Sequence, residues 1–152
     1  MEPFFGQLGL ALALGLGALG SALGIAAAAR AAAGAWAKEA KAGKPLNFAY
    51  IILVGMPLSQ TIYGFILMLI GMKASVYDPA IVAANAGALL SIGIAGGLAE
   101  MFSAWMQGLI GAAGVRCLSE GEGKGLVFII IAMGIVETVG LFSFVFLLLV
   151  LP

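Results

Sequence analysis

The chain contains four long apolar runs, each long enough to cross a lipid bilayer as a helix. The runs cover about residues 8–29, 48–71, 80–114 and 126–151. A bilayer core about 30 Å thick needs roughly 20 apolar residues in a helix, and in lipid only helices or closed barrels satisfy every backbone polar group. Charged residues make up only 9% of the chain, against about 25% of a soluble domain. The sequence therefore predicts an all-α integral membrane protein, with four transmembrane helices in one membrane domain.

The composition excludes several kinds of chemistry. The sequence has no His and one Cys, so it offers no imidazole base, no His-bound metal and no internal disulfide. Its net charge of zero argues against nucleic acid as a partner. A membrane enzyme would need polar or basic catalytic groups near the interface, and neither His nor an Arg inside a span is available. We therefore expect no catalytic centre in this chain.

The positions of Lys and Arg predict how the helices are oriented. Four of the seven basic residues lie between the first and second runs and two lie between the third and fourth, which leaves Lys73 alone on the opposite side. Cytoplasmic loops carry the excess of Lys and Arg in membrane proteins. We therefore expect loops 30–47 and 115–125 in the cytoplasm and both termini outside. No basic segment precedes the first run, so we expect a mature helix rather than a secretory signal.

The two halves of the chain resemble each other as copies of one helical hairpin. The matching segments are 21–30 with 107–116 and 60–65 with 137–142, which gives hairpins of residues 1–75 and 76–152. The first and third runs are rich in Gly and Ala, whereas the second and fourth are rich in Ile, Leu, Phe and Met. Small residues allow close helix packing in lipid. Helices 1 and 3 therefore suit the inside of a ring of several copies, and helices 2 and 4 the outside; a compact four-helix bundle is the alternative.

Glu137 is an acidic residue in the middle of the fourth run. It lies 13 residues beyond Lys124, which is about 20 Å at helical rise, and apolar sequence flanks it on both sides. An ionised carboxylate at this depth is costly unless it is protonated or paired, and no run contains a Lys, Arg or His to pair with it. We therefore expect Glu137 to bind a proton or a metal cation. The alternative is a protonated side chain with a purely structural hydrogen bond.

Polar residues that suit a cation occur at matching depth in the second run. One helical face carries Met56, Ser59, Gln60 and Tyr63. Pro57 loosens the helix there and frees an upstream carbonyl, at Leu53 for regular geometry, and such breaks expose oxygen ligands to small cations in membrane proteins. Gln107 of the third run is placed to close the site from the other hairpin. The alternative role of these polar groups, considered without the carboxylate, is only to form hydrogen bonds between helices.

The oxygen-rich composition of this candidate site favours a particular ion. Carboxylate and carbonyl oxygens suit hard cations, and a single carboxylate balances a monovalent charge. We therefore expect sodium rather than calcium or magnesium, with a proton as the alternative, because a proton needs only the carboxylate and one acceptor. Glu100 is the second acid within a run, and its depth is ambiguous because the third run is longer than a bilayer is thick. Three placements are open for it: at the interface, along an ion path, or hydrogen-bonded across the ring interior.

Together these features resemble the proteolipid ring subunit, the K or c-type subunit, of V-type and A-type rotary ATPases, closest to the sodium-translocating bacterial type. The resemblance covers all four runs and is carried by residues 57–65, 107–108 and 136–138. In that family two fused hairpins form a protomer, and protomers form a rotor ring. The resemblance implies a sodium site made by the Met56 carbonyl, Ser59, Gln60, Gln107 and Glu137, with Tyr63 hydrogen-bonded to the carboxylate. Family members have Thr where this chain has Ser59, so the hydroxyl group is retained here.

The resemblance also implies partners and a location. The partners are other copies of the chain, the surrounding lipid, a stator membrane subunit with a basic residue, and a central-stalk subunit at the cytoplasmic loops. The membrane implied is a prokaryotic plasma membrane. ATP would be hydrolysed or synthesised in other subunits, while this chain carries Na+ or H+ during ring rotation. The alternative function is a non-rotary cation channel or small transporter that uses the same carboxylate.

Overall fold

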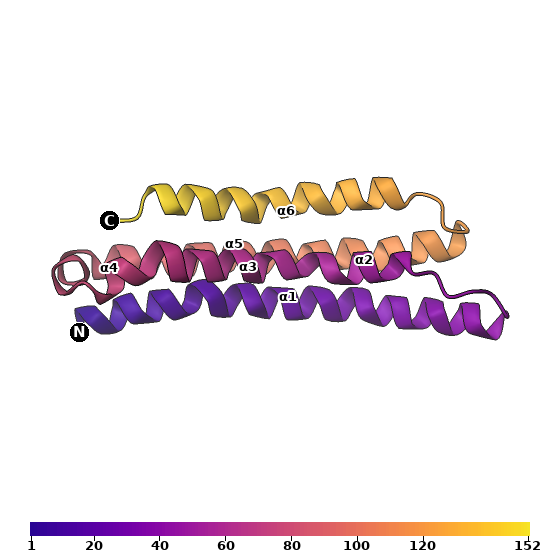
Figure 1. Ribbon diagram of the computed structural model, residues 1–152, viewed down its shortest axis with the longest axis horizontal. Helices are drawn as coiled ribbons and strands as arrows, with labels where there is room; N and C mark the ends of the chain where they lie inside the picture. Colours follow the sequence, from indigo (N-terminus) through magenta and orange to yellow (C-terminus); the bar gives the residue numbers. More distant parts are fainter.

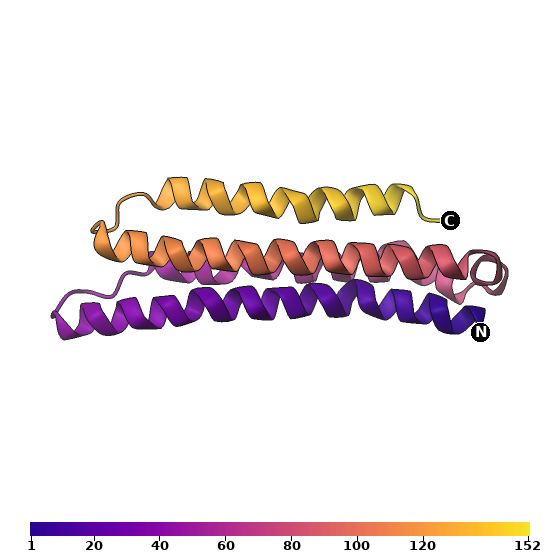
Figure 2. The same ribbon diagram turned by 180° about the vertical axis from the view of Figure 1, so that it is seen from behind.

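The computed structural model describes residues 1–152 as four long helical rods that run side by side in alternating directions (Figures 1 and 2). The elements are α1 (Glu2–Lys41); a second rod made of α2 (Ala49–Gly55), the 3-10 turn η1 (Met56–Leu58), α3 (Ser59–Ile66), the π-helical η2 (Leu67–Met72) and α4 (Lys73–Tyr77); α5 (Pro79–Glu120); and α6 (Leu126–Leu149). Each rod is long and apolar enough to cross a membrane. This confirms the prediction of an all-α protein with four candidate spans.

Three of the rods are longer than the sequence analysis predicted, and the second rod continues to Tyr77 rather than ending at Gly71. Helix α1 continues to Lys41 rather than ending at Ala29, and α5 continues to Glu120 rather than ending at Gly114. The Ala-rich continuation of α1 has high helix propensity. It also packs into a cluster of buried side chains at the end of the molecule that carries the connections. That cluster includes Ala32, Ala35, Tyr50, Leu53, Val115 and Leu118. The connections are therefore residues 42–48 and 121–125, shorter than the predicted loops.

Helices α1 and α5 pack so closely that their backbones touch at glycine pairs. A methyl group at Gly93 would overlap the backbone of Gly9, and one at Gly108 would overlap the backbone of Gly24. The buried positions of α1 are all Gly, Ala or Ser and, apart from the adjacent pair Gly20 and Ser21, recur every three or four residues. Small residues of this kind allow close approach of helices in lipid. Helix α6 lies against α5 on the side away from α1 (Figure 2). The inner and outer circles of a ring stay a prediction.

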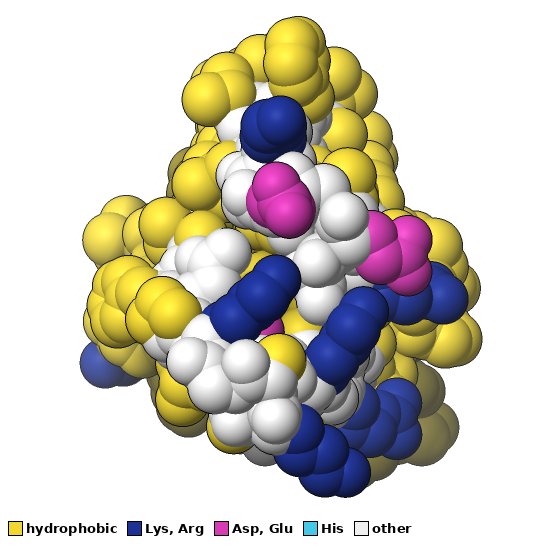
Figure 3. Space-filling view, turned by 90° about the vertical axis from the view of Figure 1, so that its right-hand side faces the viewer, with side chains coloured by type: hydrophobic (Ala, Val, Ile, Leu, Met, Phe, Trp, Pro, Cys, Tyr) yellow, Lys and Arg dark blue, Asp and Glu magenta, His cyan; other side chains and the backbone are white.

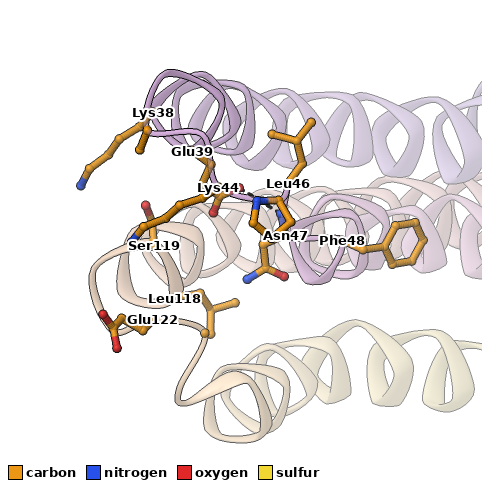
Figure 4. Close-up of a pocket in the computed structure, with 12 residues that line it drawn as sticks. Lys38, Glu39, Lys44, Leu46, Asn47, Phe48, Leu118, Ser119 and Glu122 are labelled. Atoms are coloured by element: carbon orange, nitrogen blue, oxygen red, sulfur yellow. Dashed lines mark hydrogen bonds between the residues drawn. The ribbon is translucent and has the colours of Figure 1, made fainter.

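The end of the molecule that carries the two connections is polar and basic. Figure 3 looks onto this end and shows Lys and Arg side chains gathered there. The connection 42–48 is held to α1 because Trp36 Nε1 donates to Asn47 O at 3.0 Å and the Asn47 N–H donates to Glu39 Oε2 at 2.9 Å. Tyr50 also donates to Glu39. A cavity of about 510 Å³ opens between the two connections, lined by residues that include Lys38, Lys44, Ser119 and Glu122 (Figure 4).

Candidate ion-binding site

Glu137 lies in the middle of α6, and neutral donors alone hold its carboxylate. Oε1 accepts a hydrogen bond from the Tyr63 hydroxyl at 3.0 Å, and Oε2 accepts one from Gln107 Nε2 at 3.1 Å. The one ion pair in the structure joins the Met1 amino group to Glu2, so no Lys or Arg neutralises Glu137. The side chain is half-buried. Its charge therefore has hydrogen-bond partners in the protomer but no counter-charge.

The second rod changes its helical geometry next to this carboxylate. Pro57 lacks an N–H, which interrupts the α-helical pattern, and Met56–Leu58 forms a 3-10 turn. This turn places the Ser59 hydroxyl 3.1 Å from the Met56 carbonyl oxygen and 3.1 Å from Gln60 Oε1. The Leu53 carbonyl, which regular geometry would free, packs against α5, where a methyl group at Gly111 would lie 3.0 Å from it. The break thus gathers three oxygen atoms at one point of the rod.

Two glutamine amides connect the three rods at this depth. Gln60 and Gln107 are both fully buried. Gln60 Nε2 donates to Gln107 Oε1 at 3.2 Å, and Gln107 Nε2 donates to Glu137 Oε2 and, at 3.2 Å, to the Met133 carbonyl. An unbroken path of polar contacts therefore leads from α3 through α5 to α6. The structure brings together all six residues that the sequence analysis named for the site.

Ser103 belongs to the same network, although the sequence analysis did not name it. Its hydroxyl accepts from Gln60 Nε2 at 3.1 Å and donates to the Val136 carbonyl at 3.0 Å. Ser103 precedes Gln107 by four residues on α5, so both side chains project from one helical face. The four-residue spacing from Gln107 was the sequence feature that pointed to Ser103. Ser103 fixes the Gln60 amide against α6, directly beside the peptide that leads into Glu137.

The polar groups form a closed circuit around a small region of the membrane-spanning part. Tyr63 lies one helical turn beyond Ser59 and Gln60, so its bond to Glu137 returns the network to α3. The candidate ligands contribute the Met56 carbonyl, the Ser59 hydroxyl, the amide oxygens of Gln60 and Gln107, and one carboxylate. Oxygen atoms of this kind, with a single negative charge, are suited to a hard monovalent cation.

Glu100 does not join this network. It is 1% exposed and lies inside the protomer, where α1 and α6 pack against it. Neither of its carboxylate oxygens has a hydrogen-bond partner. Glu100 therefore needs an explanation separate from that of Glu137.

Four membrane-length helices, with a carboxyl group on α6 that is hydrogen-bonded from α3 and α5, are the features of a proteolipid-type membrane protein. The family model that describes the C subunit of ATP synthase matches residues 8–71 and 90–150, one segment in each half. The chain belongs to this ATP synthase C-subunit family, and it is a c-type ring protein with a duplicated hairpin. Members of the family form oligomeric rings with other subunits of an ATP synthase-type complex. A comparison with curated proteins gives no match.

Proposed function

We propose that this chain is the rotor-ring subunit of a V-type ATPase or ATP synthase and that each protomer carries one Na+ on Glu137. The observation that carries the proposal is the closed circuit of polar groups around a carboxylate that no Lys or Arg neutralises. An ionised carboxylate in the apolar part of a membrane needs such a neutralising partner. A bound cation supplies the missing charge.

The hydrogen-bond donors around Glu137 favour sodium over a proton. Tyr63 and Gln107 both donate to the carboxyl oxygens, so neither contact provides an acceptor for a carboxylic O–H. A protonated Glu137 would need an acceptor for its own O–H, whereas an ionised one leaves oxygen lone pairs free for a cation. The oxygens of Met56, Ser59 and Gln60 lie together beside the Pro57 turn. They complete a ligand set of five oxygen-bearing groups of the kind that replaces the water shell of a hard cation.

Transport would follow from the electrostatics of Glu137. With Na+ bound, the half-buried side chain is neutral and can pass through lipid as the ring turns. At a stator subunit, a basic residue would compensate the emptied carboxylate, while two offset half-channels release the ion to one side and load it from the other. Each protomer carries one such carboxylate for its four spans, because the matching position of the first hairpin is Gln60. A ring of this kind moves fewer ions per turn than one of two-helix subunits with as many helices.

The basic end of the molecule would face the cytoplasm and the central stalk. Five of the seven Lys and Arg residues occur in the two connections or within five residues of them, and Arg30 lies further back on α1. Figure 3 shows such side chains gathered on this end. Positive charge of this kind marks the cytoplasmic side of a bilayer. Both termini would then lie outside, and ATP chemistry would be confined to soluble subunits that act on the ring through the stalk.

Carbodiimide labelling tests the proposal, because these reagents attack protonated acids in membranes. With the purified ring we expect sodium to slow the labelling of Glu137 at constant pH, while potassium at equal ionic strength does not. Glu137→Gln serves as the control for label at other sites. If sodium gives no protection at any pH, the sodium assignment is wrong and protons are the ion carried.

The assembly state separates a rotor from a channel. A rotor subunit should purify as a large, detergent-resistant oligomer that associates with a soluble ATPase. A monomer or dimer that conducts cations by itself in vesicles would contradict the rotary function and support the channel.

A further inference from the structure

Glu100 is a buried acid that the proposed sodium site does not use. It lies on α5 with 1% of its surface exposed. Both of its carboxylate oxygens are buried without a hydrogen-bond partner, and no other side chain in the structure has buried polar atoms in this condition. Buried polar atoms in proteins are nearly always hydrogen-bonded. Such an exception needs a physical explanation.

The surroundings of Glu100 are built to admit a carboxyl group. Helix α5 runs between α1 and α6 (Figure 2), and both neighbours present glycine to Glu100. A methyl group at Gly140 of α6 would lie 2.7 Å from Glu100 Oε2, and one at Gly17 of α1 would lie 3.3 Å from Glu100 Cβ. The carboxyl group thus occupies space that a side chain on α6 would fill. Gly140 follows Glu137 by three residues, so the two carboxyl groups lie within about one helical turn along α6.

No charge or free donor compensates Glu100. The single ion pair in the structure joins Met1 to Glu2, and the titratable groups near enough to interact with Glu100 through their charge are Glu137 on α6 and Tyr63 on α3. Tyr63 already donates to Glu137. Ser103, one turn further along α5, accepts from Gln60 and donates to Val136. An ionised Glu100 would therefore be a second negative charge near that of Glu137, buried and with no hydrogen-bond donor.

We propose that Glu100 is a second cation-binding carboxyl of each protomer and that its cation is a proton, retained while Glu137 exchanges its own ion. One carboxylate oxygen gains a proton, and no other bond forms or breaks. A proton needs only one acceptor for its O–H, whereas sodium needs several oxygen ligands. Ser103 Oγ, which can accept a second hydrogen bond, flanks the same point of α6 as Glu100 Oε2, because a methyl group at Gly140 would lie 3.0 Å from the first and 2.7 Å from the second. Glu100 does not line the cavity of about 510 Å³ between the two connections, nor one of about 270 Å³ between α5 and α6.

The burial of the two acids explains why only one of them would exchange its ion. Glu137 is half-buried on α6, whereas Glu100 is enclosed by α1, α5 and α6 and cannot meet a stator residue unless those helices separate. Glu100 would then hold its proton through the whole cycle, and each protomer would present one exchangeable charge. This inference stands whether Glu137 carries sodium or a proton.

Infrared spectroscopy of the solubilised ring tests the inference, because a protonated carboxylic acid absorbs apart from a carboxylate. In saturating sodium we expect a protonated-carboxyl band in the wild type that Glu100→Gln removes and Glu137→Gln retains. Gln is neutral and similar in shape to a protonated Glu, so the Glu100→Gln ring should assemble. If no band depends on Glu100, the inference is wrong. Failure of the sodium assignment alone would instead add a second band that Glu137→Gln removes.

Two further measurements keep the test decisive. Bound sodium should amount to one ion per protomer in both the wild type and Glu100→Gln; two ions that fall to one would show that Glu100 binds sodium and overturn the proton assignment. If Glu100→Gln does not assemble, Gly140→Ala replaces it, because the added methyl group meets Oε2 and should shift the band. Gly134→Ala on the same helix meets no neighbouring atom within 4 Å and should not. Identical spectra from both glycine variants would contradict the placement of the proton on Glu100.

Discussion

Replacement of Gln107 by Ala is the most informative perturbation of the candidate ion site, because this side chain links the other two rods. Gln107 is fully buried; it accepts from Gln60 at 3.2 Å and donates to the Glu137 carboxylate at 3.1 Å. A hydrogen bond to a charged group contributes about 1.5–3 kcal/mol. Since about 1.4 kcal/mol corresponds to tenfold in affinity, its loss should weaken sodium binding by about 10- to 150-fold. Removal of the amide oxygen as a ligand acts in the same direction.

The assay is equilibrium binding of radioactive sodium to purified rings, with ring assembly checked on the same samples. Gln7→Ala is the matched control, because Gln7 is the one glutamine outside the site and its side chain is exposed near the N-terminus. We expect Gln7→Ala to bind sodium as the wild type does. A Gln107→Ala ring that assembles and binds sodium within about twofold of the wild type would refute the ligand set.

Three other substitutions test separate parts of the structure. Ser59→Ala should weaken sodium binding by about 2- to 12-fold, the worth of one neutral hydrogen bond, whereas Ser91→Ala removes an exposed hydroxyl that bonds only a backbone carbonyl of its own helix and should change nothing. Glu137→Gln should abolish sodium-coupled ATP turnover in rings that still assemble; sodium-stimulated turnover in this variant would contradict the role of the carboxylate. Gly108→Ala should destabilise the protomer by about 1–3 kcal/mol through overpacking against α1, measured by thermal unfolding in detergent. Gly15→Ala, which meets open space, should not, and equal stability of the two glycine variants would argue against close α1–α5 packing.

The number and order of the helices could be predicted because the bilayer imposes a length on every span. The helix ends could not be predicted in the same way. Hydropathy changes at Arg30, where the apolar run stops, but a helix continues in water when its residues favour it and it still has a surface to pack against. Ala32 and Ala35 are buried against the second rod and α5, so α1 passes beyond the apolar run without a break. Hydropathy thus marked the limit of the apolar run rather than the limit of the helix.

The site residues were predictable from helical spacing and from depth counted from the loops. Ser59, Gln60 and Tyr63 share one face, and Gln107 and Glu137 lie at matching depth, so close approach required only that the rods run side by side. The spacing to Gln107 was not enough to assign Ser103 to the site, because a serine in a helix commonly bonds a carbonyl of its own helix, as Ser91 and Ser143 do here. Whether it instead bonds across to α6 depends on how the helices are rotated. The same rotation decides that Glu100 lies inside, which sequence periodicity in so apolar a helix does not specify.

The uninterrupted length of α1 bears on how a rotor of such protomers would respond to load. Its 40 residues give a rod about 60 Å long, roughly twice the thickness of the bilayer core. The part beyond the apolar run is still helix. Hydrogen bonds hold it to the connection and the second rod, because Glu39 accepts from Tyr50 and Asn47, and Trp36 donates to the Asn47 carbonyl. Torque applied at the connections would therefore reach the ion-carrying carboxylates through stiff, parallel rods. The elastic element of such a rotary complex would then have to lie in its other subunits.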